Sequence, residues 1–189
     1  MRVTKHRRHL CLLPAAIVAL TLGLCSCADG DSVELDELGE HVAHDGATVV
    51  GQFKDNESRM GTVRAERLVA DASEDERCHD GSRRVWRTDI SLDWPGDPAD
   101  LSQVDSLFDG TTDFVAGRFR EMGYTAAYQH FGDSDTPRWG VYQRRIADDD
   151  SSDTDVEFRV TFQLAPEQND DQTITVEVDI IGSTPCVES

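Results

Sequence analysis

The sequence lacks the short motifs that mark common classes of catalytic and nucleotide-binding site. It has no GxSxG motif, no glycine-rich phosphate-binding loop, no CxxC pair and no HExxH motif. Acidic pairs of the kind used in glycoside hydrolysis are abundant among its 37 Asp and Glu, and for that reason no single pair stands out. We therefore predict no catalytic residue, no cofactor and no dedicated metal site.

Basic charge is also scarce. The chain has 18 Lys and Arg against 37 Asp and Glu, a formal net charge of −19. Nucleic-acid binding requires a basic surface, and anionic membranes attract polybasic segments, so neither partner is expected. The acids instead predict a well-solvated, soluble domain surface.

No hydrophobic run is long enough for a comfortable membrane span. The apolar run CLLPAAIVALTLGL near the start has 14 residues and follows a basic segment with Arg2, Lys5, Arg7 and Arg8. A basic segment before a short apolar run is typical of a secretory signal peptide. We expect residues 1–26 to be that signal.

The signal ends in the stretch LGLCSCAD, which resembles the lipobox of bacterial lipoproteins. Leu24 lies three residues before Cys27, and the small residue Ser26 directly precedes it. The resemblance implies cleavage between Ser26 and Cys27, with a diacylglyceryl group on the Cys27 thiol as the membrane-lipid anchor. Cys25 fits poorly because the bulky Leu24 would precede the cut. Residues 27–31 would then be the lipidated cysteine and a short tether.

Two other interpretations of this stretch stay open. The segment could be uncleaved and its thiols reduced. It could also form a two-cysteine zinc clip, although zinc prefers four ligands and no second pair lies nearby. With the signal removed, four of the basic residues and no acid are lost, so 163 residues with a formal charge of −23 remain.

Cysteine is nearly absent from the predicted mature domain, where only Cys78 and Cys186 follow the anchor. Outside the cytoplasm such a pair is normally oxidised, and two cysteines allow one connectivity. A bridge closing roughly 100 residues would contribute about 3–5 kcal/mol in the chain-entropy model. The alternative is a nucleophilic Cys78 activated by its neighbours His79 and Asp80, but adjacent residues rarely form that geometry.

Hydrophobic periodicity predicts two amphipathic helices. The first runs from about residue 33 to residue 54, with Ser32 as its cap and HDGAT weakening its middle. The second begins at Asp97–Pro98 and ends before Gly123, with FDGTTDF as a weak interior. The apolar stripes consist of Leu35, Leu38, Val42, Gly46, Val49 and Phe53 in the first helix, and Leu101, Val104, Phe108, Val115, Phe119 and Met122 in the second. Residues 56–80 show no clear pattern.

Alternation of apolar and polar residues predicts strands in RVWRTDISLDW, YTAAYQHF, RWGVYQRRIA, VEFRVTFQL and TITVEVDIIG. Clean alternation favours an antiparallel sheet with one solvated face. We expect an α+β fold, a two-layer sandwich of about four to five strands covered on one face by two helices. Residues 32–189 would form this single domain.

These features together resemble the small α+β envelope lipoproteins of actinobacteria, the LppA-like type among them. The features are the lipobox, an N-terminal helix, Cys78 before a strand, a helix ending in MGY and a C-terminal STPCV. The resemblance spans most of the mature chain and implies the fold, the Cys78–Cys186 pair and the lipid on Cys27. It implies no catalytic residues.

Three sets of residues remain as candidates for binding. His41 and His44, with Glu37 and Glu40, have helical spacing for a metal but also suit a solvated helix face. The acidic stretches 132–135 and 148–155 could attract calcium, yet lack the glycine and terminal glutamate of an EF-hand loop. Six aromatic residues could provide a platform for a glycan, or could simply face the core: Trp86, Trp94, Trp139, Tyr124, Tyr128 and Tyr142.

The sequence therefore predicts a lipid-anchored protein at the outer face of the cytoplasmic membrane, acting as a binding or interaction module for an unknown protein or envelope ligand. An envelope hydrolase that uses acidic residues is the alternative.

Overall fold

The computed structural model describes residues 30–130, 132, 136–146, 155–168 and 172–188. Ser26, Cys27 and the whole predicted signal lie outside the described residues, as do most of the two acidic stretches. Within the described part, no helix is both long and apolar enough to cross a membrane.

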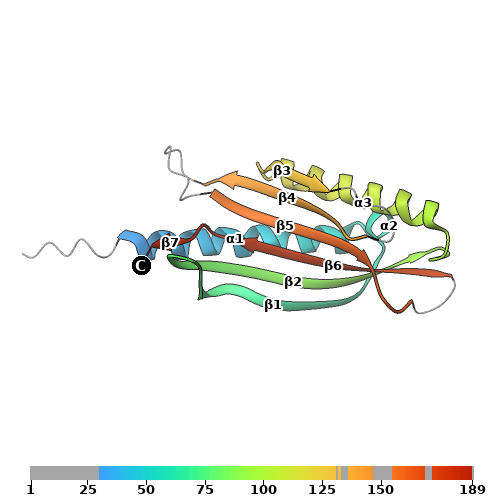
Figure 1. Ribbon diagram of the computed structural model, residues 1–189, viewed down its shortest axis with the longest axis horizontal. Coiled ribbons are helices and arrows are strands. Elements are labelled where there is room, and N and C mark those ends of the chain that lie inside the picture. Colours follow the sequence, from blue (N-terminus) through green and yellow to red (C-terminus); the bar gives the residue numbers. More distant parts are fainter. Residues whose placement is uncertain (1–29, 131, 133–135, 147–154, 169–171, 189) are drawn as a thin grey trace, which may run out of the picture.

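The chain forms an antiparallel sheet packed against two helices (Figure 1). The helices are α1 (Gly30–Asp55), the single turn α2 (Glu57–Met60) and α3 (Leu101–Glu121). The strands are β1 (Thr62–Arg77), β2 (Gly81–Pro95), β3 (Thr125–His130), β4 (Arg138–Arg145), β5 (Asp155–Leu164), β6 (Thr173–Ser183) and β7 (Val187–Glu188). The predicted α+β class is confirmed.

The sheet is larger than predicted. Its strand order is β1-β2-β6-β5-β4-β3, and the two-residue β7 also pairs with β2, which gives seven strands among the described residues instead of the predicted four to five. The additional long strand is β1, from the stretch left unassigned. It is an edge strand with three register irregularities and mostly exposed side chains, so it lacks the alternation of a half-buried strand.

Both long helices cover the same face of the sheet (Figure 1). Helix α1 packs against β1, β2 and β6, whereas α3 packs against β3 and β4. The predicted α1 stripe is confirmed, because its five apolar members are all buried. The sixth, Gly46, provides space for a ring of the sheet: a Cβ atom there would lie 2.5 Å from Cε3 of Trp86.

Helix α3 starts later than predicted. Asp100, and not Asp97, is its N-cap, accepting hydrogen bonds from the backbone N–H groups of Ser102 and Gln103. Asp97 lies in the preceding turn, where it accepts from the N–H of Ala99 at 2.8 Å. Leu101 was predicted to be on the buried stripe, but it is 53% exposed because it occupies the first helical position.

The polar interior of α3 does not break the helix. Thr111 is buried and donates its hydroxyl to the carbonyl of Leu107, one turn earlier, at 2.8 Å. A threonine that bonds within its own helix satisfies its hydroxyl without leaving helical geometry. The helix ends, as predicted, before Gly123, whose φ of +89° is accessible to glycine.

The covered face of the sheet is the hydrophobic core. Buried residues alternate along the three central strands β2, β6 and β5 and meet the apolar stripes of α1 and α3. Phe119 of α3 stacks on Tyr142 of β4 with ring centroids 4.4 Å apart. The other face is covered by no described helix, as predicted for an antiparallel sheet with one solvated side.

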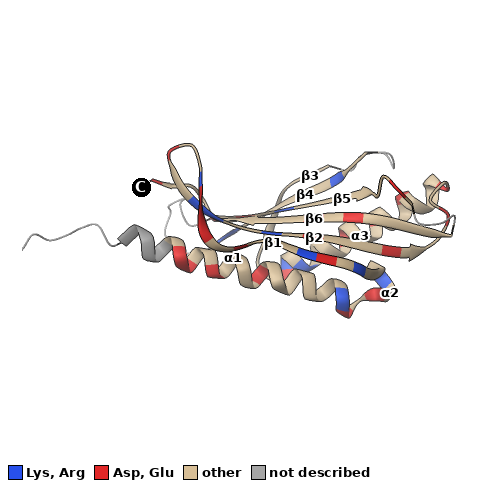
Figure 2. Cartoon of the chain, turned by 90° about the horizontal axis from the view of Figure 1, so that it is seen from below, with Lys and Arg blue, Asp and Glu red and all other residues tan. Residues whose placement is uncertain are grey.

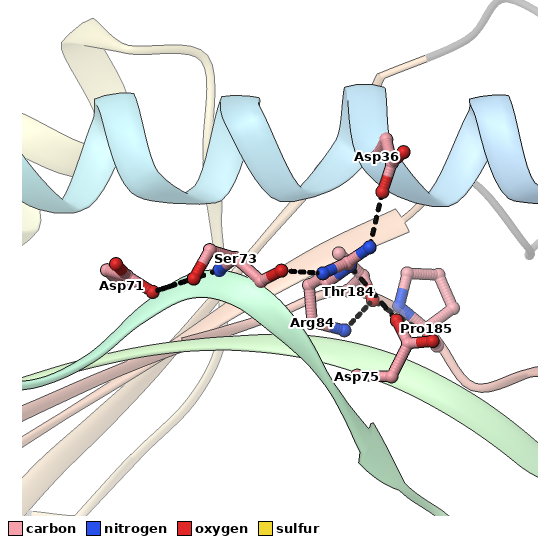
Figure 3. A network of polar contacts seen from close by, with 7 residues as sticks. All are labelled: Asp36, Asp71, Ser73, Asp75, Arg84, Thr184 and Pro185. Carbon is pink, nitrogen blue, oxygen red and sulfur yellow. Dashed lines mark hydrogen bonds and ion pairs between the residues drawn. The ribbon is translucent and has the colours of Figure 1, made fainter.

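The end of the domain where α1 begins is held together by a disulfide bond and a charged junction. Cys78 and Cys186 are bonded, with Cα atoms 6.0 Å apart, which confirms the predicted pairing. Nearby, Arg84 of β2 contacts Asp36 of α1 and the backbone carbonyl of Ser73 in β1, and lies 3.1 Å from Asp75 (Figure 3). Its side chain is only 14% exposed, so these partners compensate its charge.

The same junction fixes the last strand. The Arg84 backbone N–H donates to the hydroxyl of Thr184 at 2.9 Å, and that hydroxyl donates to the carbonyl of Pro185 (Figure 3). Beside it, β1 bends at Ala72, whose φ is +64°, and Asp71 accepts hydrogen bonds from Ser73. Helix α1, the hairpin β1–β2 and the C-terminal segment therefore meet at one point.

Candidate functional site

The solvated face of the sheet, here called the open face, carries a row of side chains in exact register across six strands. The strand pairings place each member directly opposite the next, from the edge strand β3 to the edge strand β1. The row consists of His130, Trp139, Thr161, Asp179, Asp89 and Arg67. At about 4.8 Å per strand it spans about 24 Å.

One end of the row is aromatic. Tyr128 of β3 is 56% exposed, and its ring centroid lies 4.9 Å from that of Trp139 on β4. The ring of His130 lies 6.0 Å from the same indole, and the guanidinium of Arg159 on β5 lies 5.1 Å from it. Trp139 is thus fixed by its neighbours, while Tyr128 presents its ring to solvent. An exposed ring held in this way loses little conformational entropy when a ligand stacks on it.

The rest of the row, from Thr161 to Arg67, lines a hollow of about 600 Å³ above β1, β2, β6 and β5. Asp89 and Asp179 face each other across the β2–β6 pair. The Nε atom of Arg87 donates to Asp179 at 2.8 Å and lies 3.6 Å from Asp89, and Arg67 donates to Asp89 from β1. The lining also includes three neutral polar residues: Ser91, Thr161 and Gln163.

The two facing carboxyls have pKa values displaced in opposite directions. Partial burial raises the pKa of each. At Asp89 the hydrogen bond from Arg67 and the charge of Arg87 outweigh burial, so the pKa of Asp89 lies below its ordinary value. At Asp179 burial outweighs the contact with Arg87, and the neighbouring Asp89 adds to it, so the pKa of Asp179 lies above its ordinary value.

The hollow is close to charge balance although the chain is strongly acidic. On the open face its lining holds three carboxylates, from Asp89, Glu177 and Asp179, and the guanidinium groups of Arg67 and Arg87. Glu66 also borders the hollow, but its side chain points to the covered face of the sheet, where it pairs with Lys54 of α1 at 2.6 Å. Figure 2 shows that acidic residues recur along α1, whereas β1 carries both signs of charge.

The six aromatic candidates divide between the two faces of the sheet, and their role as a ligand platform stays a prediction. Tyr128 and Trp139 lie on the open face and contact each other. The other four aromatic candidates are buried in the core: Trp86, Trp94, Tyr124 and Tyr142. Tyr124 donates its hydroxyl to the buried Asp45 of α1 at 2.8 Å, and burial, with Asp45 adding to it, raises the pKa of Tyr124. Arg144 of β4 completes this contact at 3.0 Å from Asp45.

The other candidates gain no support as sites. His44, Glu37 and Glu40 are exposed on α1 and His41 is partly exposed. Among the residues that the structure describes, no three His, Cys, Asp or Glu side chains gather closely enough to hold a metal ion. The thiol of Cys78 is consumed by its bond to Cys186, which excludes the nucleophile reading for the oxidised protein.

Sequence reasoning did not identify Arg67, Arg87, Asp89 and Asp179 as a group. The alternation assigned Arg87 and Asp89 to the solvated side of their strand, but only the strand order brings β1 and β6 to either side of β2. No family model, curated protein or solved structure matches this chain.

Proposed function

We propose that this protein is a lipid-anchored extracytoplasmic binding module whose ligand surface is the open face of the sheet. The observation that carries the proposal is the row across that face, with an exposed aromatic pair at one end and a polar hollow beside it. Concave surfaces with a few convergent polar groups and an aromatic anchor are the usual form of binding sites.

The location is proposed from the sequence. The lipobox-like LCSC places a lipid on Cys27, and the resemblance to LppA-like envelope lipoproteins supports the same location. The disulfide Cys78–Cys186 is consistent with an oxidising compartment outside the cytoplasm. A short tether of residues 27–31 would hold the disulfide-bonded end of the domain near the membrane and leave the open face accessible from the side.

Photo-crosslinking in intact cells that produce the full chain tests the surface. The residue p-benzoylphenylalanine is placed at position 128, on the open face, or at position 101, at the start of α3. Leu101 is a matched control because it is 53% exposed, close to the 56% of Tyr128. Position 128 should give a discrete crosslinked product and position 101 should not. Equal patterns from both positions would count against the open face as the ligand surface.

The anchor has a separate test. The substitution Cys27→Ala removes the thiol that would carry the lipid, so the chain should no longer be acylated and should leave the membrane fraction. If the variant is recovered wholly with the membranes, Cys27 is not the anchor. Crosslinking from position 128 should also weaken in this variant if the ligand is a membrane or cell-wall component.

An envelope hydrolase is the second candidate, favoured by one observation. Asp89 and Asp179 face each other, and the pKa of Asp89 is lowered while that of Asp179 is raised. The general acid and general base of one active site have pKa values separated in this way. Their oxygens, however, already accept from Arg67 and Arg87, so a substrate would have to displace these contacts. Turnover of an envelope polymer that is lost in Asp179→Asn would favour the hydrolase over the binding module.

A further inference from the structure

The aromatic pair and the hollow form one continuous surface. Thr161, which lines the hollow, lies directly opposite Trp139 in the β4–β5 pairing. One strand spacing of about 4.8 Å therefore separates the aromatic end from the rim of the hollow. A ligand long enough to stack on Tyr128 would reach the polar groups of the hollow if it lay across the strands.

The charge of this surface selects the chemistry of the ligand. A cationic ligand would be attracted to the chain as a whole, with its net charge of −19. In the hollow, by contrast, Asp89 and Asp179 are already paired with guanidinium groups, and the third carboxylate, Glu177, accepts a hydrogen bond from Gln163. The hollow therefore offers many hydrogen-bonding groups but little net charge.

The types of side chain in the hollow narrow the class of ligand further. The lining offers donors from Arg67, Arg87 and Gln163, acceptors from the carboxylates, and hydroxyls from Ser91 and Thr161 that can do both. Neutral polyhydroxylated ligands present both donors and acceptors along their whole length. Pyranose rings also have apolar C–H faces, which pack on aromatic rings such as that of Tyr128.

We propose that the open face binds a neutral oligosaccharide segment lying across the strands, with one sugar on Tyr128 and the following sugars over the hollow. This inference rests on the proposed function, because it names the ligand of the same surface. The open face differs from a peptide-binding or cation-binding face in its balance of charge and in its mixture of hydrogen-bond donors and acceptors.

Calorimetric titration of the mature lipoprotein in lipid nanodiscs tests the ligand class. The probes are cellohexaose, N-acetylated chitohexaose, maltohexaose and mannohexaose as neutral sugars, and a chitosan hexamer as the cationic comparison. At least one neutral sugar should bind saturably and more tightly than the chitosan hexamer. Binding of none of the four neutral sugars, or tighter binding of the chitosan hexamer, would overturn the proposal.

Two variants locate the binding. Tyr128→Ala should weaken binding of the neutral sugar about tenfold, the usual loss for an anchoring aromatic residue. Thr161→Val, which keeps the size of the side chain and removes its hydroxyl, should also weaken it. Leu101→Ala, at an equally exposed position away from the open face, should leave the affinity unchanged. Equal affinities of Tyr128→Ala and Leu101→Ala would refute the placement.

The two proposals can fail separately. If position 128 crosslinks to a protein in cells and no neutral sugar binds, the open face remains a binding surface and the saccharide assignment is wrong. If position 128 crosslinks no more than position 101, the proposed function itself fails, whatever the sugars do in vitro.

Discussion

Replacing Gly46 of α1 by alanine fills the space in which the indole ring of Trp86 packs. The added Cβ would lie 2.5–2.7 Å from three atoms of that ring, closer than non-bonded carbons approach. Trp86 is buried and its ring lies 6.4 Å from that of Phe158, so it cannot move without disturbing the core. The substitution Gly51→Ala is the matched control, because a Cβ there meets nothing within 4 Å on the same helix.

The two substitutions share one favourable contribution. Alanine in place of glycine inside a helix stabilises by about 0.8–1.0 kcal/mol. At Gly46 the overpacking cost of about 1–3 kcal/mol opposes this gain. Gly51→Ala should therefore raise the free energy of unfolding by about 1 kcal/mol, while Gly46→Ala should lower it by up to about 2 kcal/mol. The difference between the two variants equals the packing cost alone.

Urea unfolding followed by far-ultraviolet circular dichroism measures both changes as shifts in midpoint at constant slope. A second background checks the cause: in Trp86→Leu, whose smaller side chain leaves room, Gly46→Ala should become stabilising by about 1 kcal/mol. If both glycine substitutions stabilise equally in the native background, the packing of Trp86 against α1 is not as described.

The remaining predictions concern the disulfide, the facing carboxyls and the buried polar contact. The double substitution Cys78→Ser/Cys186→Ser should lower the free energy of unfolding by about 4–5 kcal/mol, the loop-closure value for the sequence separation of 108 residues. A loss below about 1 kcal/mol in urea unfolding would contradict this prediction. Asp89→Asn should destabilise the protein more at pH 7 than at pH 3. The pKa of Asp89 is lower in the folded state, so its carboxylate stabilises the fold above the unfolded-state pKa of about 4, and this stability is lost on acidification. Asp179→Asn should show the opposite trend. The pKa of Asp179 is higher in the folded state, so this group stabilises the fold below its unfolded-state pKa, and the stability is lost as the pH rises through the folded-state pKa. Parallel pH profiles of the two variants would disprove the assignment. Tyr124→Phe should cost about 0.5–1.5 kcal/mol and Asp45→Ala about 1–3 kcal/mol, since only the second leaves buried polar groups without their partner; thermal unfolding giving the reverse order would refute this.

Much of the fold could be predicted because its signals are local. The stripe from Leu35 to Phe53 and the alternation from Val156 to Leu164 each report one buried face, and the structure buries both. The register of β1 could not be read in this way. As an edge strand with bulges it exposes Leu68 and Val69 in succession, so no two-residue period exists to detect.

The candidate site was predictable only in part, for a related reason. Trp139 and Tyr142 lie an odd number of residues apart in one strand, so their side chains point to opposite faces of the sheet. The sequence could therefore predict that one aromatic residue lies on the solvated face. The meeting of Asp89 with Asp179 depends on β6 returning to pair with β2, 90 residues away in sequence, and no local pattern specifies that neighbour. The start of α3 shows the same limit at short range, because Asp97 and Asp100 both have cap chemistry and the turn geometry selects Asp100.

Export and lipidation underlie the whole account, since the oxidised Cys78–Cys186 bond and an envelope ligand both require a location outside the cytoplasm. Mass spectrometry of the N-terminal peptide, taken from protein isolated with the membranes, tests this most directly. We predict a first residue of Cys27 carrying a diacylglyceryl group, with residues 1–26 removed. An unmodified chain that begins at Met1 and is recovered from the cytosol would contradict it.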